Sequence, residues 1–206
     1  KLKLSSIDEK VWPFFTIIIV SLFFGLFTFL EKLLIKSSDS TCNLLGLSFK
    51  SDALYGGPEY ETLATFGSYC GIDNMEAVIR ANALCNMYGI DTISCGATIS
   101  WAMEAWKEGK LTVEDTGGLE INYGDAEMMV KLTEMIGKRE GFGDLLAEGS
   151  AIAAEKIGRG TEDYLITSKG QEAPAHMPQV KRSLSVIYAA NPFGADHMSS
   201  EHDPSY

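Results

Sequence analysis

The pattern of hydrophobic and polar positions changes along this 206-residue chain, and each part predicts a different kind of structure. Residues 11–30 form an apolar run without a charged residue, about long enough to cross a bilayer as a helix. From residue 73 to residue 157 apolar side chains recur at helical spacing, whereas residues 163–178 contain two prolines and favour a short extended segment. The pattern predicts a mostly α, multihelical fold with few short strands.

Capping residues locate the predicted helices more closely. The first begins at Asp73, which forms a capping-box pattern with Glu76, and ends at Gly89. Asp91 caps the second, over 92–107. Asp125 is predicted to cap a third helix, which carries a methionine-rich core face. A fourth helix is predicted over 144–157, with an interruption at Gly149. A fifth is predicted over 181–190 and ends before Asn191-Pro192.

Composition divides the chain into three parts. Residues 1–49 are an atypical leader that contains the apolar run, residues 50–165 are predicted to be one helical domain, and residues 166–206 are predicted to start another. The first residue is Lys1 and the last, Tyr206, ends a loop-like run, so we expect a piece of a longer chain. The apolar run is either a transmembrane anchor or part of a leader that is not native, and composition alone leaves both open.

Charge and cysteine content argue against several classes of function. A formal net charge of −11 argues against a nucleic-acid partner, because no basic stripe exists to neutralise phosphates. The four cysteines (Cys42, Cys70, Cys85, Cys95) have no C-x-x-C spacing, so neither a zinc ribbon nor a redox dithiol is indicated. We expect buried thiols in a reducing compartment, and hence a cytoplasmic protein. No histidine or acid spacing matches a known metal motif, so no metal ligand is predicted.

Two residues are candidates for proton transfer. Glu61 follows a GGP turn at the start of an apolar run, where it either compensates a helix dipole or stands at the mouth of a cavity. His197 lies in a GADH turn and is either an inert loop residue or a proton shuttle. His176 and His202 are weaker candidates.

The turn from Asn86 to Asp91 joins the first two predicted helices. Gly89 supplies a left-handed C-cap and Asp91 an N-cap, which is a complete structural explanation. Such a turn also exposes backbone N–H groups and a carboxylate at a helix N-terminus, where a polar heterocycle or an anion can bind.

Four blocks, in this order, resemble the tungsten-containing aldehyde ferredoxin oxidoreductase family: GGPEYETLATFG, CNMYGIDTIS, KGQE and GADH. The resemblance covers about residues 50–206. It implies a helical pair of domains and a tungsten, or in some relatives molybdenum, held between two pyranopterin dithiolenes beside a [4Fe–4S] cluster. Glu61 and His197 match the family's active-site glutamate and histidine, which are proposed to handle protons.

The same resemblance assigns a cofactor-binding turn. Asn86, Gly89, Ile90 and Asp91 match the first pterin motif, D-x-x-G-L-C/D, with Asn in place of Asp and Ile in place of Leu. Asp91 would bind the pterin amine. The family's C-x-x-C-x-x-x-C cluster motif is missing, because the positions before Cys42 at that spacing are Ile35 and Ser38. The second pterin motif would lie beyond Tyr206.

The resemblance implies part of an oxidoreductase that oxidises small aldehydes to carboxylic acids with ferredoxin as the electron acceptor. We expect the fragment to be inactive alone. Two alternatives stay open: a catalytically inactive, membrane-tethered helical scaffold, and a family member with another oxo or acyl-CoA substrate. Membrane attachment and homo-oligomerisation are also open.

Overall fold

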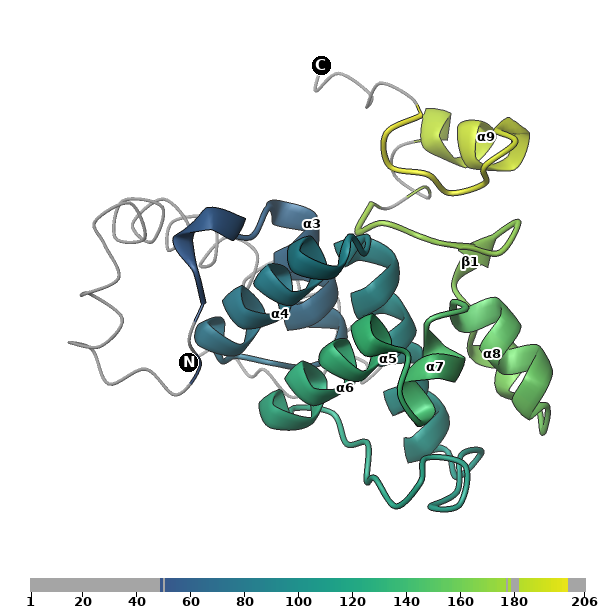
Figure 1. Ribbon diagram of the computed structural model, residues 1–206. Coiled ribbons are helices and arrows are strands. Elements are labelled where there is room, and N and C mark those ends of the chain that lie inside the picture. The colour runs from purple at the N-terminus through teal and green to yellow at the C-terminus, as the bar shows by residue number, and fades with distance from the viewer. Residues whose placement is uncertain (1–48, 50, 177, 179–181, 200–206) are drawn as a thin grey trace, which may run out of the picture.

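A computed structural model describes residues 49, 51–176, 178 and 182–199 (Figure 1). The leader with its apolar run, Cys42 and His202 lie outside the described residues. Among those that are described, no helix is both long and apolar enough to cross a membrane. The elements are η1 (Ala53–Tyr55), α3 (Tyr60–Thr62), the π-helix η2 (Leu63–Tyr69), α4 (Met75–Tyr88), α5 (Thr92–Lys107), α6 (Ala126–Lys138), α7 (Phe142–Leu146), α8 (Ser150–Ile157), η3 (Thr161–Tyr164), β1 (Thr167–Ser168), β2 (Gln171–Glu172) and α9 (Arg182–Ala190).

This architecture confirms the predicted mostly α class with few strands. α5 spans the predicted range, and its N-cap Asp91 accepts a hydrogen bond from the Ser94 N–H at 2.9 Å. The Asp125 side chain caps α6 in the same way, accepting from the Met128 N–H at 2.9 Å. α9 begins one residue after the predicted start.

Two helix predictions were wrong in detail. Asn74, and not Asp73, is the N-cap of α4, because its side-chain oxygen reaches the Ala77 N–H at 3.2 Å. The helix predicted over 144–157 is two helices, α7 and α8. Gly149 between them has φ 86°, a left-handed backbone that an α-helix cannot contain.

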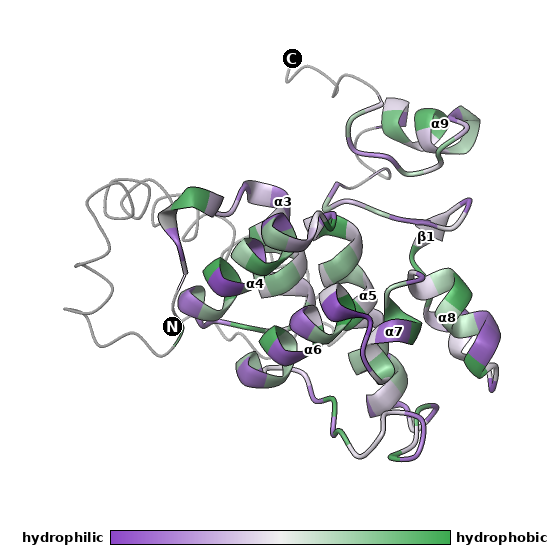
Figure 2. Cartoon of the chain, viewed as in Figure 1, coloured by the Kyte–Doolittle hydropathy of each residue, from purple (hydrophilic) through white to green (hydrophobic). Residues whose placement is uncertain are grey.

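The main core lies between α4, α5 and α6; α4 and α6 run side by side in the centre of Figure 1, and α5 packs against both. Figure 2 shows apolar positions on the faces that these helices turn toward one another. Met129 on α6 is fully buried, which confirms that its methionine-rich face is core. The three described cysteines are free and buried, as expected. Fully buried large side chains of this core include Leu84, Ile99, Met103, Met129 and Leu132.

The π-helix η2 packs against α5 at a very short separation. A Cβ atom on Gly96 would lie 2.7 Å from the Thr65 side chain, so only glycine allows this approach. The Thr65 hydroxyl lies 3.0 Å from the Glu61 carbonyl and 3.2 Å from the Thr92 carbonyl. This packing fixes the start of α3 beside the start of α5.

The hairpin of β1 and β2 connects separate parts of the fold. Lys169 (φ 55°) and Gly170 (φ 83°) form its two-residue turn, in which both residues need positive φ. The buried Glu172 Oε1 accepts hydrogen bonds from the Ser150 N–H at 2.8 Å, the Ser150 hydroxyl at 2.7 Å and the Thr98 hydroxyl at 3.1 Å. One carboxylate therefore joins the hairpin to α8 and α5.

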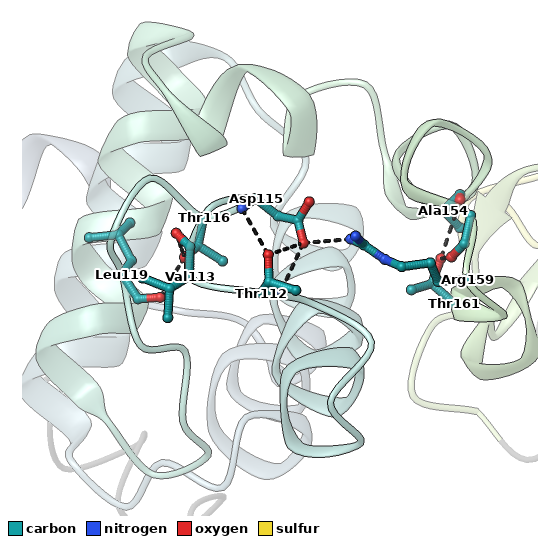
Figure 3. Close-up of polar contacts among 9 residues, drawn as sticks. Thr112, Val113, Asp115, Thr116, Leu119, Ala154, Arg159 and Thr161 are labelled. Carbon is teal, nitrogen blue, oxygen red and sulfur yellow. Dashed lines mark hydrogen bonds and ion pairs between the residues drawn. The ribbon is translucent and has the colours of Figure 1, made fainter.

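A second polar network holds the connector between α5 and α6 (Figure 3). Asp115 Oδ2 accepts from the Thr112 N–H at 2.7 Å, the Thr112 hydroxyl at 2.9 Å and Arg159 Nη2 at 2.5 Å. Slight burial raises the pKa of Asp115, but the hydrogen bonds from Thr112 and the Arg159 charge outweigh it and leave the pKa below its usual value. The network ties the connector to the turn after α8.

Candidate functional site

Glu61 lies at the start of α3 and is only 6% exposed. Its Oε2 accepts a hydrogen bond from the Ala175 N–H at 2.7 Å. Its Oε1 lies 3.1 Å from His176 Nε2 and 4.0 Å from His197 Nδ1. The structure therefore brings the two predicted proton-handling residues together and adds His176 between them.

The two imidazoles also contact each other. His176 Nε2 lies 3.0 Å from His197 Nδ1, and the two ring planes are within 8° of parallel. An ionised Glu61 carboxylate can only accept hydrogen bonds, so His176 Nε2 must then carry a hydrogen and donate it. His197 Nδ1, which lies against the same Nε2–H, then acts as a hydrogen-bond acceptor. The three groups form a short path for a proton from a buried carboxylate to His197, whose side chain is 25% exposed.

Two backbone segments place the histidines. His176 follows strand β2, and the loop 194–197 after α9 carries His197. Gly194 has φ 76°, and a Cβ atom on it would lie 1.9 Å from the Ser168 carbonyl oxygen. Glycine is required here because the loop lies directly on β1. The Ser168 hydroxyl also donates to the Tyr188 carbonyl at 3.0 Å, which holds α9 against the hairpin.

The charge of Glu61 affects the pKa of two nearby tyrosines. Burial and the nearby Glu61 carboxylate both raise the pKa of Tyr69 well above its usual value. Burial, Glu61 and Asp196 raise the pKa of Tyr188 to about 12. The Tyr188 hydroxyl is buried and has no hydrogen-bond partner among the described residues. Both phenols therefore stay neutral at physiological pH.

The predicted cofactor turn lies next to this cluster. Gly89 adopts the left-handed backbone (φ 69°), as predicted, and Asp91 caps α5. The Thr62 and Thr92 hydroxyls are 2.8 Å apart, so the residues following Glu61 and Asp91 are in direct contact. Glu61, His197 and the turn 86–91 thus converge, although they are far apart in the sequence.

The turn presents groups of the kind that bind a polar heterocycle, whereas the described cysteines do not fit an iron–sulfur cluster. Asp91 is exposed at the N-terminus of a 16-residue helix, where a carboxylate and backbone N–H groups can bind a polar heterocycle. The Asn86 amide instead donates back to the Asn82 carbonyl at 2.9 Å, so its nitrogen is engaged within α4. The cysteines that the structure describes are buried in the helical core. Cluster ligands would have to come from outside the described residues.

His176 is the site residue that the sequence indicated least. It follows an Ala-Pro-Ala run after the hairpin, and no spacing relative to Glu61 or His197 marks it. The signal is purely tertiary, because the Ala175 N–H that binds Glu61 fixes the backbone one residue before His176. The roles of Glu61, His197 and the turn residues stay predictions.

Comparison with known proteins gives a consistent assignment. The family pattern described as "Aldehyde ferredoxin oxidoreductase, domains 2 & 3" matches residues 37–205. The tungsten-containing aldehyde ferredoxin oxidoreductases of Pyrococcus abyssi and Pyrococcus furiosus are 40% and 38% identical over 145 residues, which are 69% and 70% of this chain and 24% of each relative. The WOR-like subunit of an aliphatic sulfonate oxidoreductase from Pyrococcus furiosus is 34% identical over 154 residues, 72% of this chain and 24% of the relative.

A solved structure supports the same fold. The active-site complex of benzoyl coenzyme A reductase with 1,5-dienoyl-CoA aligns with a TM-score of 0.54 and 25% identity, covering 65% of this chain and 20% of that one. The chain spans about a quarter of the length of the curated relatives it matches. From the family pattern and these relatives, which are all named as oxidoreductases, the chain belongs to the aldehyde ferredoxin oxidoreductase family.

Proposed function

We propose that this chain forms part of the active site of a tungsten- or molybdenum-bis-pterin enzyme that oxidises aldehydes to carboxylic acids, with ferredoxin as electron acceptor. The observation that carries the proposal is the contact of Glu61 with His176 and His197 beside the turn 86–91. Asp91 and the backbone of that turn would hold one pterin. The rest of the full-length protein would supply the cluster ligands.

The reaction converts an aldehyde and water into a carboxylic acid, two protons and two electrons. The bound metal and cluster supply two-electron acceptance and one-electron transfer to ferredoxin. The residues of this chain handle the protons. Glu61 Oε1 accepts a proton from the attacking water. His176 Nε2 passes its own hydrogen to His197 Nδ1 and takes the proton from Glu61, so that one proton moves toward solvent over separations of 3.1 and 3.0 Å.

Burial separates this proton path from bulk water. Glu61 is 6% exposed, so bulk water competes little for its carboxylate, and the Ala175 N–H keeps Oε2 fixed while Oε1 faces the histidines. The neutral hydroxyl of Tyr188 adds a polar group without a charge near the carboxylate. These features support a role for Glu61 in proton removal.

Substitution of Glu61 in the full-length parent protein tests the proposal. Glu61→Gln removes the base and keeps the size, so kcat/KM for aldehyde oxidation is expected to fall by a factor of about 10² to 10⁴. Tungsten and iron contents should stay unchanged, which separates lost chemistry from lost cofactor. Glu59→Gln, the same change at an exposed position two residues away, is the matched control. Full activity of Glu61→Gln would reject the proposed role.

A different substrate is the second candidate, because one relative is named as an aliphatic sulfonate oxidoreductase and the aligned structure as a benzoyl coenzyme A reductase. Assay of the parent with aldehydes, alkyl sulfonates and aromatic acyl-CoA compounds distinguishes these classes. The proposed function expects the largest kcat/KM with an aldehyde.

The inactive-scaffold alternative makes the opposite prediction for metal content. Metal analysis of the parent, produced without oxygen and with tungstate, should show tungsten and about four irons per chain if it is an oxidoreductase. Absence of both metals from the parent would favour the scaffold.

A further inference from the structure

Glu61, His176 and His197 present three metal-ligating atoms to one point. We propose that these residues form a site for one divalent first-row transition-metal ion, bound by Glu61 Oε1, His176 Nε2 and His197 Nδ1. These atoms are separated by 3.1, 3.0 and 4.0 Å. A point equidistant from three atoms so spaced lies about 2.0 Å from each, which is the usual metal–nitrogen and metal–oxygen bond length. The described residues contain no other comparable cluster of three such side chains.

The surroundings already orient the ligands. The two imidazole planes are within 8° of parallel, and the proposed donor nitrogens are 3.0 Å apart. The Ala175 N–H binds Glu61 Oε2 at 2.7 Å, so Oε1 is directed toward the histidines, an outer contact typical of metal-binding carboxylates. The three ligands come from α3, the segment after β2 and the loop after α9, which are each fixed by the packing described above.

The spacing indicates which ions fit. The 4.0 Å between Glu61 Oε1 and His197 Nδ1 places these donors on nearly opposite sides of the ion, as in five- or six-coordinate geometry. Two imidazoles and one carboxylate suit Co²⁺, Ni²⁺, Cu²⁺ and Zn²⁺. A tetrahedral Zn²⁺ site would need this pair to approach by about 0.7 Å, since tetrahedral donors at such bond lengths lie about 3.3 Å apart.

This site differs from that of the pterin-held metal in its ligands, because side chains of this chain would bind the ion directly. It does not depend on the proposed function. If both proposals hold, the ion and the transferred proton occupy the same three atoms, so a bound ion should block proton transfer. Micromolar Co²⁺ or Ni²⁺ would then inhibit the parent enzyme.

Titration of the 206-residue chain with Co²⁺, after chelation and dialysis, tests the site through calorimetry and the visible absorption of the ion. We expect one ion per chain. His176→Ala and His197→Ala should each weaken binding by at least about tenfold. Glu59→Gln, which leaves the three ligands intact, should bind like the original chain. Far-UV circular dichroism checks that each variant is folded.

X-ray absorption of the Co²⁺-loaded original chain gives a readout that needs no variant, and it should show two imidazoles in the inner shell. Three results would overturn the site: no binding up to about 1 mM, an inner shell without imidazole, or unchanged affinity in the His176→Ala/His197→Ala double variant, which would mean an adventitious ion only.

Discussion

Single residues control the candidate site through backbone geometry as much as through chemistry. Gly194 is the clearest case, because its positive φ and its contact with the Ser168 carbonyl let the GADH loop lie on β1. The loop then places His197 beside Glu61. A residue without a side chain thus determines where an imidazole lies.

Gly194→Ala is expected to destabilise the protein by about 2–4 kcal/mol, because it adds left-handed backbone strain and a steric clash. Gly170→Ala is the matched control: its φ is also positive, but nothing lies within 4 Å of the added Cβ, so strain of about 1–2 kcal/mol is the whole cost. Urea unfolding of both variants measures the difference. Equal losses would show that the clash at Ser168 relaxes without cost.

Tyr188 gives a pH-dependent prediction at the same scale. Its pKa is raised to about 12, whereas an unfolded tyrosine titrates near 10. Its titration therefore leaves stability unchanged below about pH 10 and lowers stability as the pH rises from about 10 toward about 12, because the unfolded chain releases the proton there while the folded chain still holds it. Between pH 8 and pH 11 the urea midpoint of unfolding should therefore fall less for Tyr188→Phe than for the original chain.

At pH 8 the same variant should differ from the original chain by no more than about 0.5 kcal/mol, since the hydroxyl has no hydrogen-bond partner among the described residues. Tyr69 and Tyr123, whose pKa values are also raised, should leave part of the alkaline loss in place. An identical pH dependence in both proteins would contradict the assignment to Tyr188.

At the scale of elements, the N-terminus of α5 has a structural and a proposed binding role. Asp91 caps the helix through the Ser94 N–H, and the Ser94 hydroxyl in turn accepts from Gln171 Nε2 at 2.9 Å. The end of α5 is therefore held by both its own cap and the hairpin. This leaves an exposed carboxylate on a rigid support.

Two substitutions at Asp91 separate the roles. Asp91→Ala removes the cap and should cost about 1 kcal/mol, whereas Asp91→Asn keeps a good cap and should cost only a few tenths. If the carboxylate binds the pterin amine, both variants of the full-length parent should lose tungsten and pterin. Thermal unfolding of this chain and metal analysis of the parent measure the two effects. A stable Asp91→Asn parent with full tungsten content would refute the pterin contact.

At the scale of the whole molecule, buried polar groups join elements that lie far apart in the sequence. Glu172 links the hairpin to α8 and α5, and Trp101 Nε1 donates to the Thr161 carbonyl at 3.0 Å. The small apolar cluster of α9, formed by Leu184, Tyr188 and Ala195, is separate from the main core. Polar contacts through the hairpin therefore help to set where the two histidines lie.

Glu172→Ala should cost about 2–4 kcal/mol, because it leaves buried donors of Ser150 and Thr98 without their acceptor. Glu172→Gln keeps an acceptor oxygen and should cost about 1–2 kcal/mol. Glu162→Ala, at an exposed position, is the control and should change stability by less than about 0.5 kcal/mol. Chemical unfolding monitored by circular dichroism gives the three values, and a loss below about 1 kcal/mol in Glu172→Ala would disprove the linking role.

Local features of the sequence were sufficient for most helices, since caps such as Asp91 and Asp125 act on N–H groups three residues away. Where two capping residues adjoin, as at Asp73 and Asn74, local rules do not choose between them. The break at Gly149 was predicted as an interruption but not as a helix end, because residue type alone does not fix φ. In the fold Gly149 has positive φ, and the Ser150 N–H that follows it donates to Glu172 Oε1, a residue distant in sequence.

The amino-acid sequence alone predicted the helical class, the positions of α5 and α6 and the helix start at Glu61, and it contains the four blocks that identify the family. These follow from periodicity, capping and residue order, which act within a few turns of the chain. The position of His176 between Glu61 and His197 follows from the three-dimensional fold, because that contact depends on the Gly194 loop, the hairpin and the Ala175 N–H. Contacts between residues so distant in sequence are set by packing, which no local pattern encodes.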